Sequence, residues 1–549
     1  MSELKRLVQQ EQQRLALQAS LDGKKTRAER NRLGQFATPT ALATDILKYA
    51  KNILPDQADV RFLDPAIGTG SFYSAYLRVF AEKPAFSAAG FEIDDHYGKP
   101  ARQLWAGYGL DIRAEDFTKA TPPKEETEKA TLVICNPPYI RHHHMLGDEK
   151  KRLHAYISMR HGIPLSGLCG LYCYFLCLSK DWMAQGGLAA WLMPSEFMDV
   201  NYGRAVKEFL LNNVTLLHLH RFSPDDVQFG DALVSSAIVW FKNEAPAPGH
   251  MVKFSFGGSL LKPVKEKRYS IEVLREVKKW TSLPKAGESN GNANDNHNDY
   301  DNDDNGNGSN GNGTSRLVIG DLFDVKRGIA TGANEFFIMS MSDVQRRGIP
   351  LEFLVPILPS PRYLKTDLIE CDGNGTPEVE KPGFLFTSEI PEERIEKEFP
   401  NVWRYLEEGR QRGISGRYIC RNRRPWYWQE RRETAPFLCT YMGRANGKED
   451  SRPFRFILNR SKAIAANVYL MLYPKPWMKK ALREHPELAE KVWHVLQSIP
   501  VESLLGEGRV YGGGLHKLEP KELLNAPADE LTALFPGRTE TRTMQMSLF

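Results

Sequence analysis

A strand, a glycine-containing turn and a helix in direct succession constrain the fold of this chain most. Residues 61–64 (RFLD) form a short apolar run ending in Asp64, and residues 65–72 (PAIGTGSF) follow as a tight turn into a helix. Gly68 and Gly70 allow the backbone to approach a ligand closely, as glycines do in nucleotide-binding turns. The spacing is not the G-x-G-x-x-G expected for a dinucleotide with a pyrophosphate. The segment predicts an α/β sheet with a ligand site at this turn.

Two later segments place acids where such a sheet uses them. Residues 90–94 (GFEID) have the pattern of a second strand, and a carboxylate at its end usually accepts hydrogen bonds from ribose hydroxyls. In residues 114–117 (AEDF), Asp116 and Phe117 suit the amine and the ring face of an adenine. A helix cap, a surface acid or a core phenylalanine would explain each piece alone. Their order along one α/β pattern favours a ligand site.

A tetrapeptide, Asn136-Pro137-Pro138-Tyr139, directly follows the apolar run 131–135 (TLVIC). The exocyclic amine of a nucleobase is a poor nucleophile because its lone pair is delocalised into the ring. Two carbonyl acceptors can draw this nitrogen toward tetrahedral geometry, and Asn136 offers a side-chain carbonyl while Pro137 offers a backbone carbonyl at restricted φ. Tyr139 adds a face on which a base can stack. Alone, the four residues also fit a strand that ends in a rigid turn.

In this order the motifs resemble the gamma-class N6-adenine DNA methyltransferases of restriction-modification systems, and the resemblance extends along the whole chain. It implies a cofactor site for S-adenosylmethionine formed by Phe36, Thr38, Pro39, Asp64, Ala66, Gly68, Gly70, Phe72, Glu92, Ile93, Asp116, Phe117 and Asn136. It implies a catalytic set of Asn136, Pro137, Tyr139 and Phe229. Phe229 would close the other face of the target base, and Phe222, seven residues earlier, is the competing candidate.

The resemblance also implies the fold and the reaction. We expect a doubly wound, Rossmann-like class I methyltransferase domain of the α/β class, followed by a C-terminal mixed α+β target-recognition domain. The methyl group would pass from S-adenosylmethionine to N6 of a flipped-out adenine in double-stranded DNA, and would protect the site from a cognate restriction endonuclease.

The domain boundary is predicted from composition. Residues 286–315 are rich in Asn, Gly and Asp, and contain six acids but no Lys or Arg. Such a segment has too few apolar residues to bury, so we interpret it as a linker. Without those six acids the formal charge of +5 becomes +11, which suits a DNA-facing surface. The expected parts are an N-terminal extension (1–33), a catalytic domain (34–285), the linker, a recognition domain (316–537) and a tail (538–549).

The N-terminal extension has two interpretations. Leu4, Leu7, Val8, Glu11 and Leu15 follow helical spacing with one gap, and basic residues cluster toward its end. A helix packed on the catalytic domain with a solvated basic face is favoured, and a phosphate-gripping arm is the alternative.

Arginines and aromatic residues alternate in residues 417–430 (RYICRNRRPWYWQE). This composition suits contact with phosphates, guanine edges and unstacked bases, although cation–π packing gives similar clusters. The DNA-binding candidates are Arg141, Arg327, Arg421, Arg423, Arg424 and Trp426.

Several functions are not indicated by the sequence. The N-terminus lacks the layout of a secretory signal, and the longest apolar stretch, Leu165 to Leu178, is too short to span a bilayer and predicts a buried helix. Seven cysteines without C-x-x-C spacing suggest reduced thiols in a cytoplasm, and no membrane partner is expected. Adjacent His142, His143 and His144 cannot all face one metal from a regular element, so no metal is implied.

Two rival functions stay open. The Asn-Pro-Pro-Tyr device also serves methyltransferases of a protein glutamine amide, and an RNA base could be the substrate. The other rival is a non-catalytic DNA-binding subunit that keeps the fold. The last five residues, Gln545 to Phe549, resemble a peptide that docks on the bacterial sliding clamp, although a tail packed on its own domain is slightly favoured. We expect a monomer on DNA.

Overall fold

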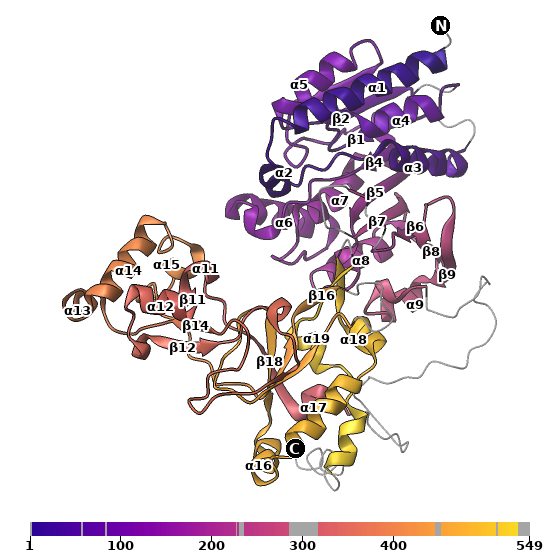
Figure 1. Ribbon diagram of the computed structural model, residues 1–549. Coiled ribbons are helices and arrows are strands. Elements are labelled where there is room, and N and C mark those ends of the chain that lie inside the picture. The colour runs from indigo at the N-terminus through magenta and orange to yellow at the C-terminus, as the bar shows by residue number, and fades with distance from the viewer. Residues whose placement is uncertain are drawn as a thin grey trace. The chain divides into compact units, whose positions relative to one another are not determined.

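The computed structural model describes residues 3–55, 59–82, 85–224, 226, 228–229, 235–284, 317–444, 452–511 and 514–535. By their contacts, these residues form two compact units, one containing those up to 284 and the other containing those from 317 onward except Tyr511. The expected linker 286–315 and tail 538–549 lie outside the described residues. Figure 1 colours the first unit indigo to magenta and the second orange to yellow.

The first unit is built on a nine-stranded sheet in the order β3-β2-β1-β4-β5-β7-β6-β8-β9. The strands are β1 Arg61–Asp64, β2 Ser87–Phe91, β3 Leu110–Arg113, β4 Ala130–Cys135, β5 Met183–Pro194, β6 Thr215–Arg221, β7 Ser236–Lys242, β8 Met251–Gly258 and β9 Pro263–Ser270. Strands β1 to β5 are parallel, and β7 runs antiparallel to both β5 and β6. The order reverses at β1, which confirms the predicted doubly wound α/β sheet.

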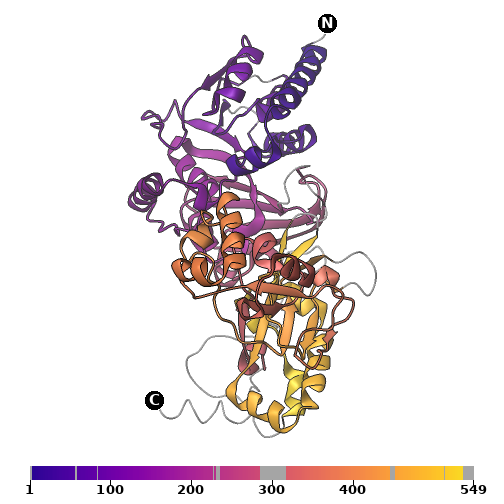
Figure 2. The ribbon, with the colours of Figure 1, turned by 60° about the vertical axis from the view of Figure 1, so that its left-hand side comes forward.

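Both faces of this sheet are covered by helices, as Figures 1 and 2 show. In β4, Leu132 and Ile134 pack into the core on one face, while Val133 and Cys135 pack into the core on the other. The helices of the first face are α3 Thr40–Ile53, α4 Ser71–Val79 and α5 Asp95–Leu104, and those of the second are α6 Gly147–His161, α7 Leu171–Trp182, α8 Gly203–Asn212 and α9 Ile271–Glu276. Because successive side chains of a strand point to opposite faces, burial on both sides requires a continuous apolar run.

Helix α1 (Glu3–Asp22) packs on α4 and α5, and α2 (Arg27–Leu33) follows it (Figure 1). The expectation of a packed helix is thus confirmed, but only part of its expected face is buried, including Leu7 and Glu11. Val8 and Leu15 are exposed by 47% and 45%, whereas Glu11 and Arg14 are buried. The buried face combines Leu7 and Leu21 with polar contacts to the glycine turn, α3 and α4, and an apolar pattern does not encode these polar contacts.

The apolar stretch Leu165 to Leu178 forms a buried helix as predicted, but α7 begins only at Leu171. Gly170 is its N-cap, and the preceding residues form a turn. Among the helices of the described residues, none is long and apolar enough to cross a membrane.

The second unit is a mixed α+β structure, as expected. Its five-stranded sheet has the order β10-β18-β15-β17-β13, with β10 Phe323–Arg327, β13 Leu368–Ile369, β15 Phe437–Thr440, β17 Phe456–Asn459 and β18 Tyr469–Pro474. Two three-stranded sheets are β11-β14-β12 (Ile338–Met339, Gly383–Phe386, Leu354–Ile357) and β16-β20-β19 (Met442–Arg444, Leu515–Lys517, Arg509–Tyr511). Its helices are α10 Ile319–Leu322, α11 Asn334–Phe337, α12 Met341–Arg347, α13 Glu392–Glu398, α14 Pro400–Gln411, α15 Tyr418–Arg421, α16 Pro476–Glu484, α17 Leu488–Ser498, α18 Val501–Glu507 and α19 Pro520–Leu524.

Candidate active site

A cavity of about 530 Å³ lies in the first unit, beside the carboxyl ends of β1, β2 and β4. Ligands of doubly wound sheets bind at this edge because the loops there leave a crevice where the strand order reverses. Most of the residues predicted for the cofactor line this cavity: Phe36, Thr38, Asp64, Ala66, Gly68, Phe72, Glu92, Ile93, Asp116, Phe117 and Asn136. The tertiary structure thus gathers motifs that are spread over a hundred positions of the chain.

The two glycines of the turn have different roles. Gly68 has a φ of +54°, and a Cβ at this position would enter open space. Gly70 is not among the residues that line the cavity, and its Cβ would lie 2.4 Å from the indole nitrogen of Trp105. The expectation that Gly70 lets backbone approach a ligand is therefore corrected. Gly70 is needed for its φ of +87° at the start of α4 and for close packing against Trp105.

Two acids face this turn, the buried Asp64 and the half-buried Glu92. The Asp64 carboxylate accepts the N–H of Ala66 at 3.1 Å, and Glu92 accepts the N–H groups of Gly68 at 3.1 Å and Asp94 at 2.7 Å. Burial raises the pKa of Asp64 to about 8 and that of Glu92 to about 7, because desolvation disfavours the charged form. Both carboxyls therefore gain from a ligand that donates hydrogen bonds or carries positive charge.

The far end of the cavity combines an apolar surface with an acid. The Phe117 ring packs edge-on against Phe91 at 5.3 Å, and Ile93 is 69% exposed. The Asp116 carboxylate accepts the N–H of Thr118 at 2.9 Å and its hydroxyl at 2.8 Å. The loop is thereby held with an acid beside apolar faces, as a purine with an exocyclic amine requires.

The side-chain amide of Asn136 has a fixed orientation. Its Nδ2 donates to the carbonyl of Phe36 at 2.8 Å and to the hydroxyl of Thr38 at 3.1 Å. Within the part of the chain that the structure describes, its buried Oδ1 has no hydrogen-bond partner. A buried acceptor without a partner is costly. Asn136 therefore offers an oriented acceptor to an N–H donor in the cavity.

Aromatic rings surround the tetrapeptide of residues 136–139. The Tyr139 ring lies 5.8 Å from Phe36 and 6.1 Å from Phe229, and its hydroxyl donates to the carbonyl of Leu192 at 3.2 Å. Phe222 lies beside His220 instead, with ring centroids 4.7 Å apart. Of the two candidate phenylalanines, the structure places Phe229 beside Tyr139.

Three residues that were predicted for the site, Pro137, Pro39 and Arg141, do not line the cavity. Pro137 is buried, and the cavity is lined by its neighbour Pro138. Pro39 is the N-cap of α3 and does not belong to the cavity wall. Arg141 is exposed at the start of the His142–His144 turn, of which His144 lines the cavity. Among the described residues there is no cluster of three potential metal ligands.

Sequence reasoning missed Gly34. It ends α2 with a φ of +63°, and its carbonyl accepts the N–H of Tyr139 at 3.3 Å. A Cβ at Gly34 would lie 2.2 Å from the backbone nitrogen of Tyr139. The close approach of Gly34 to Tyr139 is visible only in three dimensions.

Helices α1 and α7 also contribute to the cavity wall, through Gln18, Asp22, Leu171 and Phe175. In the sequence, a signal for the first pair exists: polar residues at 11, 14, 18 and 22 lie on one helical face. Such spacing is more common on solvated faces, so it is informative only together with burial.

In the second unit, the candidate DNA-binding residues separate into two groups. Trp426 is 8% exposed and packs in the core, with its ring 6.1 Å from Phe336 and 6.0 Å from Phe337. A base cannot stack on a ring that is enclosed in this way, so we correct the expectation for Trp426 and assign it to core packing.

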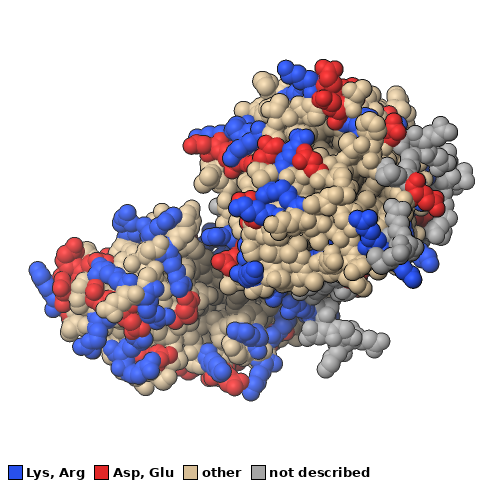
Figure 3. Space-filling model, turned by 90° about the horizontal axis from the view of Figure 1, so that it is seen from above, with Lys and Arg blue, Asp and Glu red and all other residues tan. Residues whose placement is uncertain are grey.

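The arginines differ as well. Arg423 is half-buried and donates to the carbonyls of Ala330 at 2.7 Å and Thr331 at 3.0 Å, so it supports a loop. Arg421 and Arg424 are exposed, and Arg327 is exposed with its guanidinium 4.0 Å from the Tyr441 ring centroid. On the face shown in Figure 3, basic and acidic side chains are intermixed. Arg327 and Arg424 also donate to backbone carbonyls, Arg327 to that of Asn467 at 3.0 Å and Arg424 to those of Arg421 and Arg423 at 2.9 and 2.8 Å, but their side chains are exposed.

Two family models match the chain. Residues 76–228 match the Eco57I restriction-modification methylase, and residues 312–537 match the C-terminal domain of the Type II methyltransferase M.Eco57I. The first match contains the tetrapeptide of residues 136–139, and the second contains most of the described part of the second unit.

Two Type II methyltransferases are similar to this chain along most of their length. The chain is 24% identical over 497 residues to the Type II methyltransferase M.AccI of Acinetobacter calcoaceticus, covering 90% of this chain and 85% of that one. It is 26% identical over 500 residues to M.XamI of Xanthomonas campestris pv. amaranthicola, covering 90% and 84%. Among solved structures, the Type IIL restriction-modification enzyme MmeI in complex with DNA matches with a TM-score of 0.47 and 11% identity, covering 82% of this chain and 64% of that one.

Proposed function

We propose that this chain, which is similar along most of its length to restriction-modification DNA methyltransferases, transfers a methyl group from S-adenosylmethionine to the N6 amino group of an adenine in double-stranded DNA. The observation that carries the proposal is the partnerless Oδ1 of Asn136 in the cavity wall. An exocyclic amine has two N–H donors, and an oriented acceptor of this kind suits one of them.

The residues of the site fit the cofactor and the base. Bound at the strand ends, the cofactor supplies an activated methyl group on a sulfonium. The carboxylates of Glu92 and Asp116 would hold its ribose and adenine, and the open space at Gly68 allows close approach of backbone. Asn136 and the carbonyl of Pro137 would accept the N–H groups of the target amine. Transfer then needs alignment more than acid–base chemistry, since orientation alone lowers such barriers by several kcal/mol, about 7–11 in the best cases.

The target base must leave the duplex to reach this cavity, at a cost of a few kcal/mol. Tyr139 and Phe229 would recover part of that cost by stacking, at about 1–3 kcal/mol per base. Their rings now meet edge to face at 87°, so capture of a base between them would require one ring to turn.

We expect Asn136→Ala to abolish methyl transfer while leaving cofactor affinity nearly unchanged, because the lost carbonyl acts on the target amine. Transfer of a labelled methyl group to DNA, with calorimetry for S-adenosylhomocysteine binding, measures both effects. The stacking role of Tyr139 is tested by a second pair of variants. Tyr139→Phe keeps the ring and should retain most of the activity, whereas Tyr139→Ala removes the ring and should lose activity. Turnover by Asn136→Ala within tenfold of the natural chain would contradict the assignment.

The modified base identifies the reaction. Mass spectrometry of nucleosides from methylated DNA should show N6-methyladenine. Another methylated base in DNA, or methylation of protein or RNA alone, would refute the proposal. DNA binding without methylation would support the rival function of a non-catalytic subunit.

The remaining expectations rest on the sequence. We propose that residues 34–285 form the domain that transfers the methyl group and that residues 316–537 form the domain that recognises the DNA target. The protein would act as a monomer in the cytoplasm, and methylation would protect the target from a cognate nuclease. The tail Gln545 to Phe549 lies outside the described residues, and its docking on a sliding clamp is a proposal that a peptide titration against the clamp would test.

A further inference from the structure

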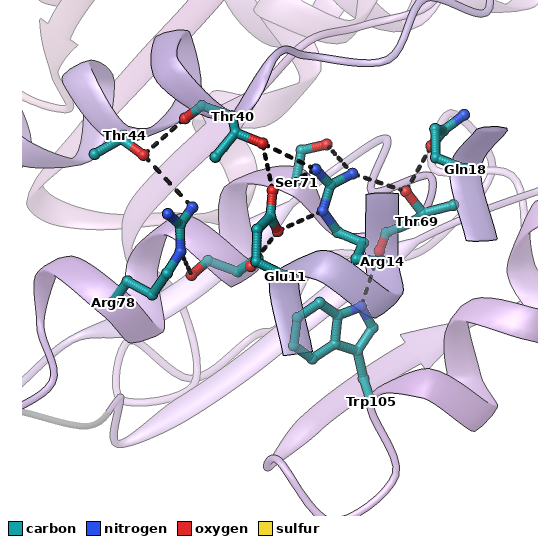
Figure 4. A network of polar contacts seen from close by, with 10 residues as sticks. Glu11, Arg14, Gln18, Thr40, Thr44, Thr69, Ser71, Arg78 and Trp105 are labelled. Carbon is teal, nitrogen blue, oxygen red and sulfur yellow. Dashed lines mark hydrogen bonds and ion pairs between the residues drawn. The ribbon is translucent and has the colours of Figure 1, made fainter. Parts of the chain in front are cut away.

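A buried ion pair lies on α1, on the side that faces the glycine turn (Figure 4). The guanidinium of Arg14 grips the carboxylate of Glu11 with two hydrogen bonds of 2.7 Å. Arg14 is 1% exposed and Glu11 is 5% exposed. Burying two charges is expensive, and well-packed apolar residues often give equal or greater stability. Folding alone therefore does not require this pair.

The contacts of Arg14 lead to the cofactor cavity. Its second terminal nitrogen donates to the hydroxyls of Thr69 at 3.2 Å and Ser71 at 2.9 Å. Thr69 belongs to the glycine turn, Ser71 begins α4, and both line the cavity. Arg14 itself is not part of the cavity wall, so it supports the turn from behind.

The contacts of Glu11 lead to α3 and, again, to α4. Its carboxylate accepts the hydroxyls of Thr40, the first residue of α3, and of Ser74 on α4, the latter at 2.5 Å. Burial alone would raise the pKa of Glu11, but these bonds and Arg14 bring it below its ordinary value, so the carboxylate stays ionised. Thr40 directly follows the segment Phe36 to Pro39, whose carbonyl and hydroxyl groups orient Asn136.

The same helix reaches the cavity one turn later. Thr69 donates its hydroxyl to the Gln18 side chain at 2.6 Å, and Gln18 donates to the Asp22 carboxylate at 2.9 Å. Asp22 also accepts the hydroxyl of Tyr97 at 2.8 Å. Gln18, Asp22 and Tyr97 all line the cavity.

We propose that Glu11 and Arg14 are positioning residues of the S-adenosylmethionine site and that α1, through Gln18 and Asp22, forms one of its walls. The ion pair holds the glycine turn, the start of α4 and the start of α3 at one fixed spacing. This role concerns the cofactor and does not depend on which base is methylated, so it goes beyond the proposed function.

The decisive variant is the full chain with Glu11→Met and Arg14→Met together. It replaces the pair by apolar side chains of similar length, so neither charge is left alone. We expect S-adenosylhomocysteine, titrated by calorimetry, to bind at least about tenfold more weakly, equivalent to one lost charge-assisted hydrogen bond. The KM for S-adenosylmethionine should rise more than kcat falls, and the thermal midpoint without cofactor should change little.

Arg78→Met is the matched control. Arg78 donates to the carbonyl of Ser74 at 3.2 Å and to the hydroxyl of Thr44 at 3.5 Å, so it belongs to the same group of helices but does not contact the turn (Figure 4). Its cofactor affinity should match that of the natural chain.

Arg14→Lys decides the question if the double variant does not fold. Lysine keeps the charge beside Glu11 but lacks the fork that reaches Thr69 and Ser71 at once. Weaker cofactor binding by a folded Arg14→Lys protein would support the proposal. Affinity within twofold of the natural chain for either Arg14 variant, or an equal loss in Arg78→Met, would overturn it.

Discussion

At the residue scale, the amide of Asn136 is oriented by residues that lie a hundred positions earlier in the chain. The carbonyl of Phe36 and the hydroxyl of Thr38 take both donors of its Nδ2, and the acceptor is left for a ligand. A rotated amide would present donors to an amine that also donates. The role proposed for Asn136 therefore depends on the placement of the loop that contains Phe36 and Thr38 as much as on its own identity.

Gly34→Ala should damage this placement. The added Cβ would meet the backbone of Tyr139 at 2.2 Å, so the two segments must separate. We expect methyl transfer to fall by about two orders of magnitude, the loss expected for a displacement of about 1 Å. Initial rates on DNA provide the measurement.

Gly162→Ala is the control for the backbone conformation. Gly162 ends α6 with a φ of +69°, and its Cβ would meet nothing within 4 Å. The strain of a left-handed residue, about 1–2 kcal/mol, is then shared by both variants. Equal rates for the two variants would show that the clash at Gly34 has no catalytic effect.

Cofactor affinity should increase with pH between about 6 and 8.5. The pKa values of about 7 for Glu92 and about 8 for Asp64 mean that both carboxyls bind protons in the free site near neutrality. A cationic ligand that donates hydrogen bonds favours the ionised forms, so binding releases protons and strengthens as pH rises. Calorimetry in buffers of different ionisation enthalpy counts these protons.

Glu92→Gln should flatten the part of this profile near pH 7. The same pKa shifts also affect the folding stability of the cofactor-free protein. An acid whose pKa is higher in the folded than in the unfolded state stabilises the fold at pH values below its unfolded-state pKa. This stabilisation is lost as the pH rises through its folded-state pKa. A cofactor affinity independent of pH across this range would contradict the link to these two carboxyls.

At the element scale, the segment after α15 shows that one basic and aromatic motif can serve two purposes. Trp426 packs with Phe336 and Phe337, while Arg421 and Arg424 remain at the surface. The composition of the segment does not distinguish the buried tryptophan from the exposed arginines, and only the packing of the folded chain does.

Trp426→Ala should therefore unfold the second unit more easily instead of weakening DNA contact directly. Loss of a large buried ring costs about 3–5 kcal/mol. Arg421→Ala with Arg424→Ala should leave the unfolding midpoint unchanged and weaken DNA binding. If both arginines contact phosphates, the slope of log affinity against log salt should fall by about 2. A stable Trp426→Ala protein with selectively weaker DNA binding would return Trp426 to the DNA surface.

At the scale of the whole molecule, the two compact units each have hydrophobic cores of their own. All residues that line the cavity belong to the first unit. We therefore expect a fragment of residues 1–285 to fold and to bind S-adenosylhomocysteine with an affinity close to that of the full chain.

The same fragment should lack sequence-specific DNA binding, since the proposed recognition domain is absent. Footprinting on methylatable DNA measures this property, with the full chain as the positive control. A specific footprint from the fragment would assign target recognition to the first unit.

The order and chemistry of the motifs predicted an α/β sheet with a ligand site at the glycine turn and a tetrapeptide after a strand, and their resemblance to a methyltransferase family supplied the doubly wound class. These features are local: a strand period, a glycine turn and the residue after a strand are determined by neighbours in the chain. Because the strands are parallel, their carboxyl ends lie at the same edge of the sheet, and the motifs that follow them are brought together.

Three facts came only from the tertiary structure. Phe229 and not Phe222 lies beside Tyr139, the Trp426 side chain is buried in the core, and Gly70 packs against Trp105. The tertiary structure also turned Glu11 and Arg14 of α1 toward the glycine turn. Each of these outcomes depends on contacts between residues that lie far apart in the sequence, where residue type and spacing leave several packings open. The free energy of those long-range contacts, and not local pattern, decides which side chain is buried and which one meets the ligand.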